Sequence, residues 1–385
     1  MTEPFFPPLH PQSHPGTMSR PVTPGFGAHN TLKCLWYKHC SDKIMEPLHI
    51  TTPLIESHAL SKLTGFPVYL KLENVQPVGS FKIRGVGNLC QKAMKRGCDH
   101  MVCSSGGNAG LAAAYSARKL NIPCTIVVPG TTPMFIVERL REERATVEVC
   151  GKSWDDADAR TRSLAEQPEK NGHCNSKMSC HSAKQLPEKP GMVVVSVGGG
   201  GLLSGVLQGM HDVGWTDVPL VAMETKGAHS FDAAIQAGEL VTLDAITSIA
   251  TCLGARTVAA KALEWTKNHK VINHVCSDEE AVLACERFAD DHRMLVEPAC
   301  GAALACVYER LFKAWQEQGK LGELKSTLVI VCGGNLVSMK AMKEWKDKLG
   351  STTDITFKKI MAVNANVKAQ KVQKEQKPFP IGPTP

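Results

Sequence analysis

Short apolar runs alternate with longer stretches of helical spacing between about residues 46 and 350. The runs are rich in β-favouring residues, and the stretches after them repeat apolar positions every three to four residues. Strands are therefore predicted within 66–73, 100–105, 123–129, 146–151, 191–201, 218–225 and 326–334, and helices within 80–97, 108–121, 133–145, 154–167, 202–214 and 335–350. This alternation is typical of an α/β protein with a mostly parallel sheet.

The two ends of the chain lack this pattern. Residues 1–45 are rich in Pro, His, Ser and Gly, and residues 351–385 form a polar stretch that ends in prolines. Such compositions bury too little apolar surface to offset the entropy of ordering. We expect a disordered N-terminal extension and a flexible C-terminal tail.

Composition narrows the classes of partner. The 385 residues are 43% hydrophobic and carry a net charge of +7, but the middle of the chain has no basic stripe with interleaved aromatic residues. No run approaches the roughly 18 apolar residues of a membrane span. We expect a globular protein that binds neither nucleic acid nor membrane. Its 15 cysteines are scattered through apolar segments, which suits reduced thiols in the cytosol better than a disulfide framework.

Four glycines, Gly198 to Gly201, follow an apolar run and precede an apolar helical stretch. Consecutive glycines can turn their N–H groups inward, and the helix start adds the positive end of a dipole, so this turn can hold a phosphate. The turn lacks the Lys-Ser/Thr pair of ATP-binding loops, and Ser204 stands where dinucleotide-binding loops have Gly or Ala. A phosphate from another kind of molecule fits better. The alternative is a tight turn that packs against a neighbouring helix.

A second turn of the same kind lies in "VCSSGGNAGLAAAYSARKL". Ser104, Ser105 and Asn108 stand at the predicted helix start, where open N–H groups and short hydroxyls can bind a carboxylate. Simple N-capping by Ser or Asn is the alternative.

A single lysine, Lys82, stands between Phe81 and Ile83 in "QPVGSFKIRG". A lysine amine can form a Schiff base when an apolar pocket desolvates it and leaves it partly deprotonated, and the two neighbours can provide that pocket. A lone lysine in a turn is more often a solvated surface charge. The two anion-binding turns in the same α/β chain favour the catalytic interpretation.

Four motifs carry a resemblance to a known family. "SFKIRG", "SSGGNAG", "SVGGGGLLSG" and "VIVCGG" occur in the order found in the fold type II, or tryptophan synthase β, family of pyridoxal-phosphate enzymes. Within that family the chain resembles the L-serine dehydratases/L-threonine deaminases, in particular their serine dehydratase-like branch, with further matches such as "TTPLIES" and "MLVEPACGAALA". The resemblance covers about residues 46 to 350.

The resemblance implies two open, twisted, mostly parallel sheets flanked by helices. A large cofactor-binding domain would comprise residues 46–90 and 187–350, and a small domain residues 91–186. The implied activity is the pyridoxal-phosphate-dependent deamination of L-serine to pyruvate and of L-threonine to 2-oxobutyrate, with release of ammonia, by a homodimer.

The resemblance also implies roles for single residues. Lys82 forms the Schiff base and then acts as acid and base. Asn108 bonds the phenolic oxygen of the cofactor, and Cys332 faces its pyridine nitrogen. Phe81 flanks the ring, and Cys252 stands where relatives pack a small alanine on it. The N–H groups that bind the phosphate belong to Gly198, Gly199, Gly200, Gly201 and Leu202. The substrate is bound by Ser104, Ser105, Gly106 and Asn108, and Ser105 is the second expected catalytic residue.

Relatives in this family also hold a monovalent cation, K+, near the phosphate-binding turn. Carbonyl groups and one carboxylate suit such a hard cation. Glu224 could instead be an ordinary acidic residue at a strand end. The matching positions are Gly198, Glu224, Ala228, Ser230, Leu253 and Ala255.

One segment, residues 168–186, departs from the family. It is shorter than in relatives, which carry a strand, a loop and a helix there, and it shows neither strand nor helix periodicity. Such a loss would remove a wall of the active-site cleft, so a catalytically impaired cofactor-binding variant is one alternative. The stretch also contains the residue types of a zinc site, but their spacing is wider than usual and favours a disordered loop. These residues are His173, Cys174, Cys180 and His181.

A second alternative is a serine racemase-like activity. It needs a base on the other face of the α-carbon, and the "SSGGNAG" motif resembles the dehydratase version more closely. Chiral analysis of serine separates the two activities.

Overall fold

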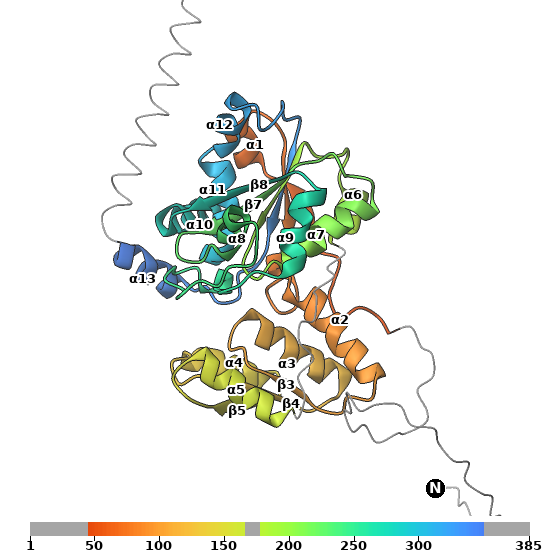
Figure 1. The fold of residues 1–385 in the computed structure, drawn as a ribbon, viewed down its shortest axis with the longest axis vertical. Helices are drawn as coiled ribbons and strands as arrows, with labels where there is room; N and C mark the ends of the chain where they lie inside the picture. The colour runs from red at the N-terminus through yellow and green to blue at the C-terminus, as the bar shows by residue number, and fades with distance from the viewer. Residues whose placement is uncertain (1–44, 166–177, 350–385) are drawn as a thin grey trace, which may run out of the picture. The chain divides into compact units, whose positions relative to one another are not determined.

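The structure, a computed structural model, describes residues 45–165 and 178–349 (Figure 1). The expected N-terminal extension, except Met45, and the expected C-terminal tail lie outside the described residues. The strands are β1 (Leu54–Glu56), β2 (Val68–Leu72), β3 (Met101–Cys103), β4 (Cys124–Val128), β5 (Thr146–Val149), β6 (Met192–Ser196), β7 (Leu220–Thr225), β8 (Val271–Cys276) and β9 (Thr327–Val331).

The helices lie between these strands. The α-helices are α1 (His58–Thr64), α2 (Lys82–Lys95), α3 (Asn108–Leu120), α4 (Met134–Glu142), α5 (Trp154–Leu164), α6 (Met178–Gln185), α7 (Gly201–Asp212), α8 (Ser230–Ala237), α9 (Ala260–Asn268), α10 (Asp278–His292), α11 (Pro298–Tyr308), α12 (Leu311–Glu317) and α13 (Met339–Leu349). Two short 3-10 helices are η1 (Glu73–Val75) and η2 (Thr251–Leu253).

The larger sheet has six strands in the order β1-β2-β9-β6-β7-β8. Neighbouring strands are parallel except β1 and β2, which pair antiparallel. Strand β9 comes late in the chain but lies between β2 and β6. The turns after β6 and β9 therefore meet at the carboxyl edge of the sheet, where α/β proteins bind their ligands.

The smaller sheet has three parallel strands in the order β3-β4-β5. Helices α3, α4 and α5 pack against it. Two mostly parallel sheets flanked by helices confirm the predicted fold class. The boundaries of the large and small domains stay a prediction.

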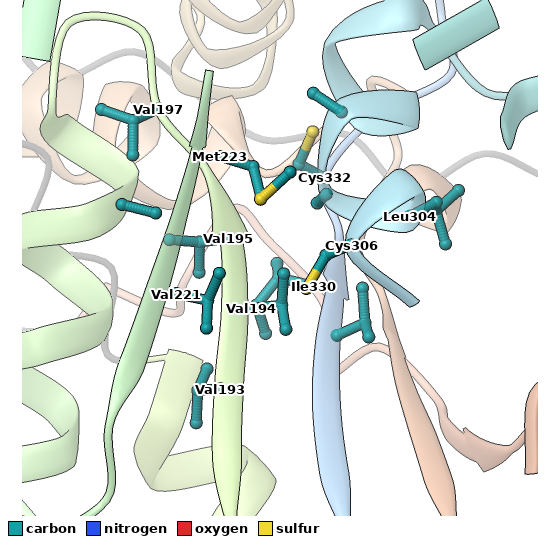
Figure 2. Packing of buried hydrophobic residues seen from close by; sticks show 14 of the residues in the cluster. Val193, Val194, Val195, Val197, Val221, Met223, Leu304, Cys306, Ile330 and Cys332 are labelled. Carbon is teal, nitrogen blue, oxygen red and sulfur yellow. The ribbon is translucent and has the colours of Figure 1, made fainter. Parts of the chain in front are cut away.

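The core of the larger sheet consists of strands that are buried on both faces. All residues of β6, β7 and β9 are buried, and Figure 2 shows Val194 and Val195 of β6, Ile330 of β9 and Cys306 of α11 among the residues of this core. Helix α11 is buried at every position and consists largely of small residues, so it can pack closely against the sheet. Burying each valine contributes roughly 1.5–3 kcal/mol, and this core holds the strand ends in place.

A buried polar network joins residues on both sides of Lys82 in the sequence. The Glu73 carboxylate accepts hydrogen bonds from Arg84 Nε and Nη2, both at 2.7 Å, and from Thr52 Oγ1 at 2.6 Å. Gln76 Nε2 donates to it at 3.0 Å. Burial alone would raise the pKa of Glu73, but the hydrogen bond and charge of Arg84 outweigh it and lower that pKa. The network ties η1 to the first turn of α2.

The prediction that residues 168–186 form no helix is wrong for Met178–Gln185, which form α6. Gln185 Oε1 accepts a hydrogen bond from Lys71 Nζ of β2 at 2.6 Å. Ser182 and Leu186 are buried. A helix this short depends on tertiary packing rather than on its own periodicity, which is why the pattern of apolar residues did not reveal it.

Residues 166–177 lie outside the described residues. His173 and Cys174 fall in this gap, and the side chains of Cys180 and His181 are not described either. The zinc alternative therefore lies outside the described part of the chain. Described cysteines such as Cys90, Cys124 and Cys285 are free thiols, as expected. Within residues 45–165 and 178–349, no helix is both long and apolar enough to cross a membrane.

Candidate active site

A cavity of about 720 Å³ lies at the carboxyl ends of β6 and β9. This volume is within the usual range of small-molecule sites, roughly 300–1,000 Å³. Segments that are far apart in the sequence meet here. The predicted site residues that line the cavity are Phe81, Lys82, Asn108, Gly198, Gly199, Gly200, Gly201, Leu202, Cys252, Leu253 and Cys332.

Lys82 begins helix α2, and its side chain is half-buried in the cavity wall. The turn before it is bound to the end of β9, because the N–H of Phe81 donates to the carbonyl oxygen of Cys332 at 3.0 Å and Ser80 bridges Gly333. The ammonium nitrogen lies 5.1 Å from the centre of the Phe81 ring. In the described part of the chain, Lys82 forms no ion pair with an acidic side chain. Its nitrogen can therefore bond to a ligand.

The glycine turn after β6 has two positions that only glycine fits. Gly200 has a φ of +80°, and a Cβ on it would lie 2.6 Å from the Cβ of Ala262. A Cβ on Gly198 would lie 2.9 Å from the Cα of Leu253. No side chain caps the N-terminus of α7. Its N–H groups are thus open toward the cavity and suit a phosphate.

A buried carboxylate that the motifs did not single out also lines the cavity. Glu297 is 3% exposed, and both of its carboxylate oxygens accept from Asn108 Nδ2, at 2.9 and 3.0 Å. The N–H of Leu336 donates to the same carboxylate at 3.0 Å. The only sequence signal is a glutamate directly before Pro298 in the motif "MLVEPACGAALA". A glutamate before a proline at the first helical position is typical of a helix start. The pattern therefore did not indicate Glu297 as a site residue.

Two thiols face the same cavity. Cys332 follows β9, and its Sγ lies 3.4 Å from Ser196 Oγ. A hydrogen bond with Cys300 lowers the pKa of Cys332 against the effect of burial. Burial raises the pKa of Cys252 well above its ordinary value, and its Sγ lies 3.6 Å from Asn108 Nδ2. Cys252 is therefore a neutral thiol at neutral pH.

The turn before α3 brings Asn108 to the cavity, but Ser104, Ser105 and Gly106 are not among the residues that line it. Ser104 Oγ donates to Asp158 of α5 at 2.9 Å. Ser105 Oγ accepts from the N–H of Gly107 at 3.2 Å. The substrate-binding role of these three residues stays a prediction. The hydroxyl hydrogen of Ser104 is already donated to Asp158.

Two of the residues predicted for a cation, Glu224 and Ser230, lie near the buried end of β7 and at the start of α8. Glu224 Oε1 accepts from the N–H of Phe231 at 2.9 Å, and Oε2 accepts from that of Asp232 at 2.7 Å. Burial raises the pKa of Glu224 to about 7. Ser230 Oγ is buried without a hydrogen-bond partner in the described part of the chain. The other predicted ligands are Gly198, Ala228, Leu253 and Ala255.

The chain belongs to the family of pyridoxal-phosphate dependent enzymes, whose match covers residues 45–333. It is similar to the serine dehydratase-like protein of Rattus norvegicus, with 54% identity over 318 aligned residues that cover 79% of this chain and 96% of that protein. It is also similar to the L-serine dehydratase/L-threonine deaminase of Homo sapiens, with 50% identity over 321 aligned residues covering 80% and 97% of the two chains.

A solved structure with the same fold is that of a fungal L-serine ammonia-lyase from Rhizomucor miehei. Its TM-score is 0.72 at 36% sequence identity, and the match covers 79% of this chain and 99% of that one. These similarities confirm the resemblance that the four motifs indicated.

Proposed function

We propose that this protein is a pyridoxal-phosphate-dependent ammonia-lyase that converts L-serine to pyruvate and L-threonine to 2-oxobutyrate. One observation carries the proposal: Lys82 and the uncapped glycine turn of Gly198 to Leu202 line the same cavity. A lysine and a phosphate-binding turn are the two groups that anchor pyridoxal phosphate. The similarity to proteins named for this activity supports the substrate class.

The residues present fit the cofactor. The N–H groups from Gly198 to Leu202 would hold its phosphate, Asn108 its phenolic oxygen and Cys332 its ring nitrogen, with Phe81 and Cys252 against the ring. Pyridoxal phosphate, when bound, supplies an electron sink for the electron pair left after loss of the substrate's α-proton.

Lys82 would bind the cofactor and then move protons. Its nitrogen takes the α-proton of the substrate and delivers a proton to the departing hydroxyl group. The half-buried position of Lys82 beside Phe81 limits the access of water to that nitrogen. A thiol at the position of Cys332, in place of a carboxylate, is a weak partner for the ring nitrogen, and this favours elimination over transamination.

The substrate carboxylate would be bound at the start of α3. Ser105 is the better side-chain candidate, since the hydroxyl of Ser104 already donates to Asp158. Open N–H groups at this helix start would supplement the hydroxyl. A movement of the turn toward the cavity would then be part of substrate binding.

We also propose a K+ site at Glu224 and Ser230. The buried carboxylate of Glu224 and the unpartnered hydroxyl of Ser230 are oxygen donors of the kind that a hard cation binds. Replacing K+ by Li+ in the buffer should lower the melting temperature and the cofactor occupancy together. Identical behaviour in the two salts would contradict the cation site.

The remaining expectations concern the state of the protein in the cell. We propose a cytosolic homodimer whose partners are small amino acids. Free thiols support a reducing compartment, and the dimer rests on the family resemblance. Sedimentation at micromolar concentration would test the dimer.

The deciding experiment is the visible absorption of the purified protein with pyridoxal phosphate, before and after borohydride, beside Lys82→Ala. We expect a band that borohydride bleaches and that the variant lacks, and release of pyruvate from L-serine. A band without pyruvate would indicate an impaired variant. No band in a folded protein would contradict the proposal.

A further inference from the structure

We propose that Glu297 is a positioning residue: it fixes the orientation of the Asn108 amide at the cavity wall and places a carboxylate in the wall of the cavity that Lys82 also lines. The inference rests on the proposed function. It extends that function by assigning a role to a residue outside the expected set of site residues.

The Glu297 carboxylate does not serve its own helix. Glu297 stands at the N-cap of α11, but its side chain makes no capping hydrogen bond. The backbone supports α11 instead, because the Glu297 carbonyl oxygen accepts from the N–H groups of Cys300 and Gly301 at 2.8 and 2.9 Å, and its own N–H donates to Gly333 at 3.2 Å. The backbone is thus anchored at both ends, and the side chain points to other partners.

The main partner of the side chain is the Asn108 amide. Both oxygens of Glu297 accept from Asn108 Nδ2, whereas Asn108 Oδ1 is buried without a partner in the described part of the chain. A flipped amide would turn its oxygen toward a carboxylate, which has no proton to donate. Glu297 is therefore the group that determines which end of the amide faces inward. The same Nδ2 donates to Cys252 Sγ at 3.6 Å at the cavity surface, so a ligand bound there would compete with this thiol for the second hydrogen.

The charge of Glu297 also acts on the cavity. In the described part of the chain it forms no ion pair with a lysine, arginine or histidine, although it is almost fully buried. Glu297 and Lys82 line the same cavity, together with Cys252 and Cys332. A buried carboxylate without a cationic partner favours a positive charge beside it. The Lys82 nitrogen, once it is joined to the cofactor, is the group that can carry this charge.

The test compares Glu297→Gln with Glu309→Gln. Glu309 lies at the other end of the same helix, pairs with Arg287 at 3.3 Å and does not line the cavity. Two properties are measured on protein reconstituted with pyridoxal phosphate: the pH midpoint of the visible band and the dissociation constant of the cofactor. Glu297→Gln should lower the midpoint by about one pH unit and weaken binding about tenfold. Glu309→Gln should change neither.

A double-mutant cycle tests whether Glu297 acts through Asn108. In the Asn108→Ala background, Glu297→Gln should weaken cofactor binding by less than about twofold, because the partner is already absent. Glu297→Asp keeps the charge on a shorter side chain and should retain the midpoint while weakening binding. If Glu297→Gln does not fold, the midpoint and the cofactor affinity of Glu297→Asp still test the proposal.

Each result decides between the two proposals. If the wild-type protein shows no visible band with pyridoxal phosphate, the proposed function fails and the role of Glu297 fails with it. If the wild-type band is present but Glu297→Gln leaves both midpoint and affinity unchanged, only the role of Glu297 is wrong. Fully additive effects in the cycle would overturn positioning through Asn108.

Discussion

Central strands of the larger sheet and the edge strand β5 of the smaller sheet differ in how completely they are buried. In the larger sheet, β6, β7 and β9 are buried at every position, whereas no residue of β5 in the smaller sheet is fully buried. Trp154, five residues after β5, is 54% exposed. The walls of the cavity follow this division, since the turns after β6 and β9 supply most of the predicted cofactor contacts and α3 supplies only Asn108 and Ala109.

This difference in strand burial indicates which part of the protein keeps fixed positions. A strand buried on both faces cannot shift without exposing apolar surface to water on each side, so the turns at its end keep fixed positions. The glycine turn and Cys332 are held in this way. A half-exposed edge strand such as β5 loses less buried apolar surface when it moves.

The largest expected effect is the loss of a buried charge in the network beside Lys82. Glu73→Gln should lower the free energy of unfolding by about 3–5 kcal/mol, because it removes the buried carboxylate that pairs with the Arg84 guanidinium. The matched pair is Glu148 of β5 with Arg160 of α5, whose side chains are 35% and 42% exposed. Glu148→Gln should cost less than about 1 kcal/mol. Urea unfolding of both variants measures the contrast, and equal losses would contradict it.

The same network predicts a dependence of stability on pH. The pKa of Glu73 is lowered in the folded protein, so its contribution is present above the ordinary carboxyl range and is lost as the pH falls through the folded value. The stability difference between the wild type and Glu73→Gln should therefore shrink in acid, below about pH 4. Urea titrations between neutral and acid pH test this, and a constant difference would argue against an ionised Glu73.

A smaller contrast should appear between valines of the two sheets. Val194 in β6 is fully buried, whereas Val149 in β5 is 57% exposed. Val194→Ala should destabilise the protein by about 2 kcal/mol through lost burial and a residual cavity, and Val149→Ala should stay within about 0.5 kcal/mol. Thermal unfolding of the two variants is the measurement. A large effect at Val149 would show that β5 is covered by another segment or chain.

The smallest effect concerns Gly106, in the turn between β3 and α3. A Cβ on Gly106 would lie 3.1 Å from Thr132 Cγ2 and 3.3 Å from Val128 Cγ1. We expect Gly106→Ala to cost about 1 kcal/mol or less, since a threonine in a loop can adjust. Thr132→Ser removes the nearer methyl group and should recover most of the loss in the double variant. No recovery would mean that Val128 in the strand sets the limit.

Local patterns were sufficient to predict much of the fold. The strands of the larger sheet that are buried on both faces stand out as continuous apolar runs, and the glycine turn follows one of them. Strand β8 does not stand out, because Asn273 and His274 interrupt its apolar residues. Helix α6 was missed for a related reason, since contacts such as Lys71 with Gln185 stabilise it rather than its own periodicity.

By itself, the sequence determined the alternation of strands and helices, the phosphate-type turn at Gly198 to Gly201 and the apolar neighbours of Lys82, because each depends on residues close together in the chain. Only the tertiary structure decided which side chains meet. It joined Asn108 to Glu297 across 189 positions and turned Ser104 toward Asp158. Such contacts depend on the order of strands in the sheet and on the packing of helices over it. Neither is encoded in the spacing of residues within a motif.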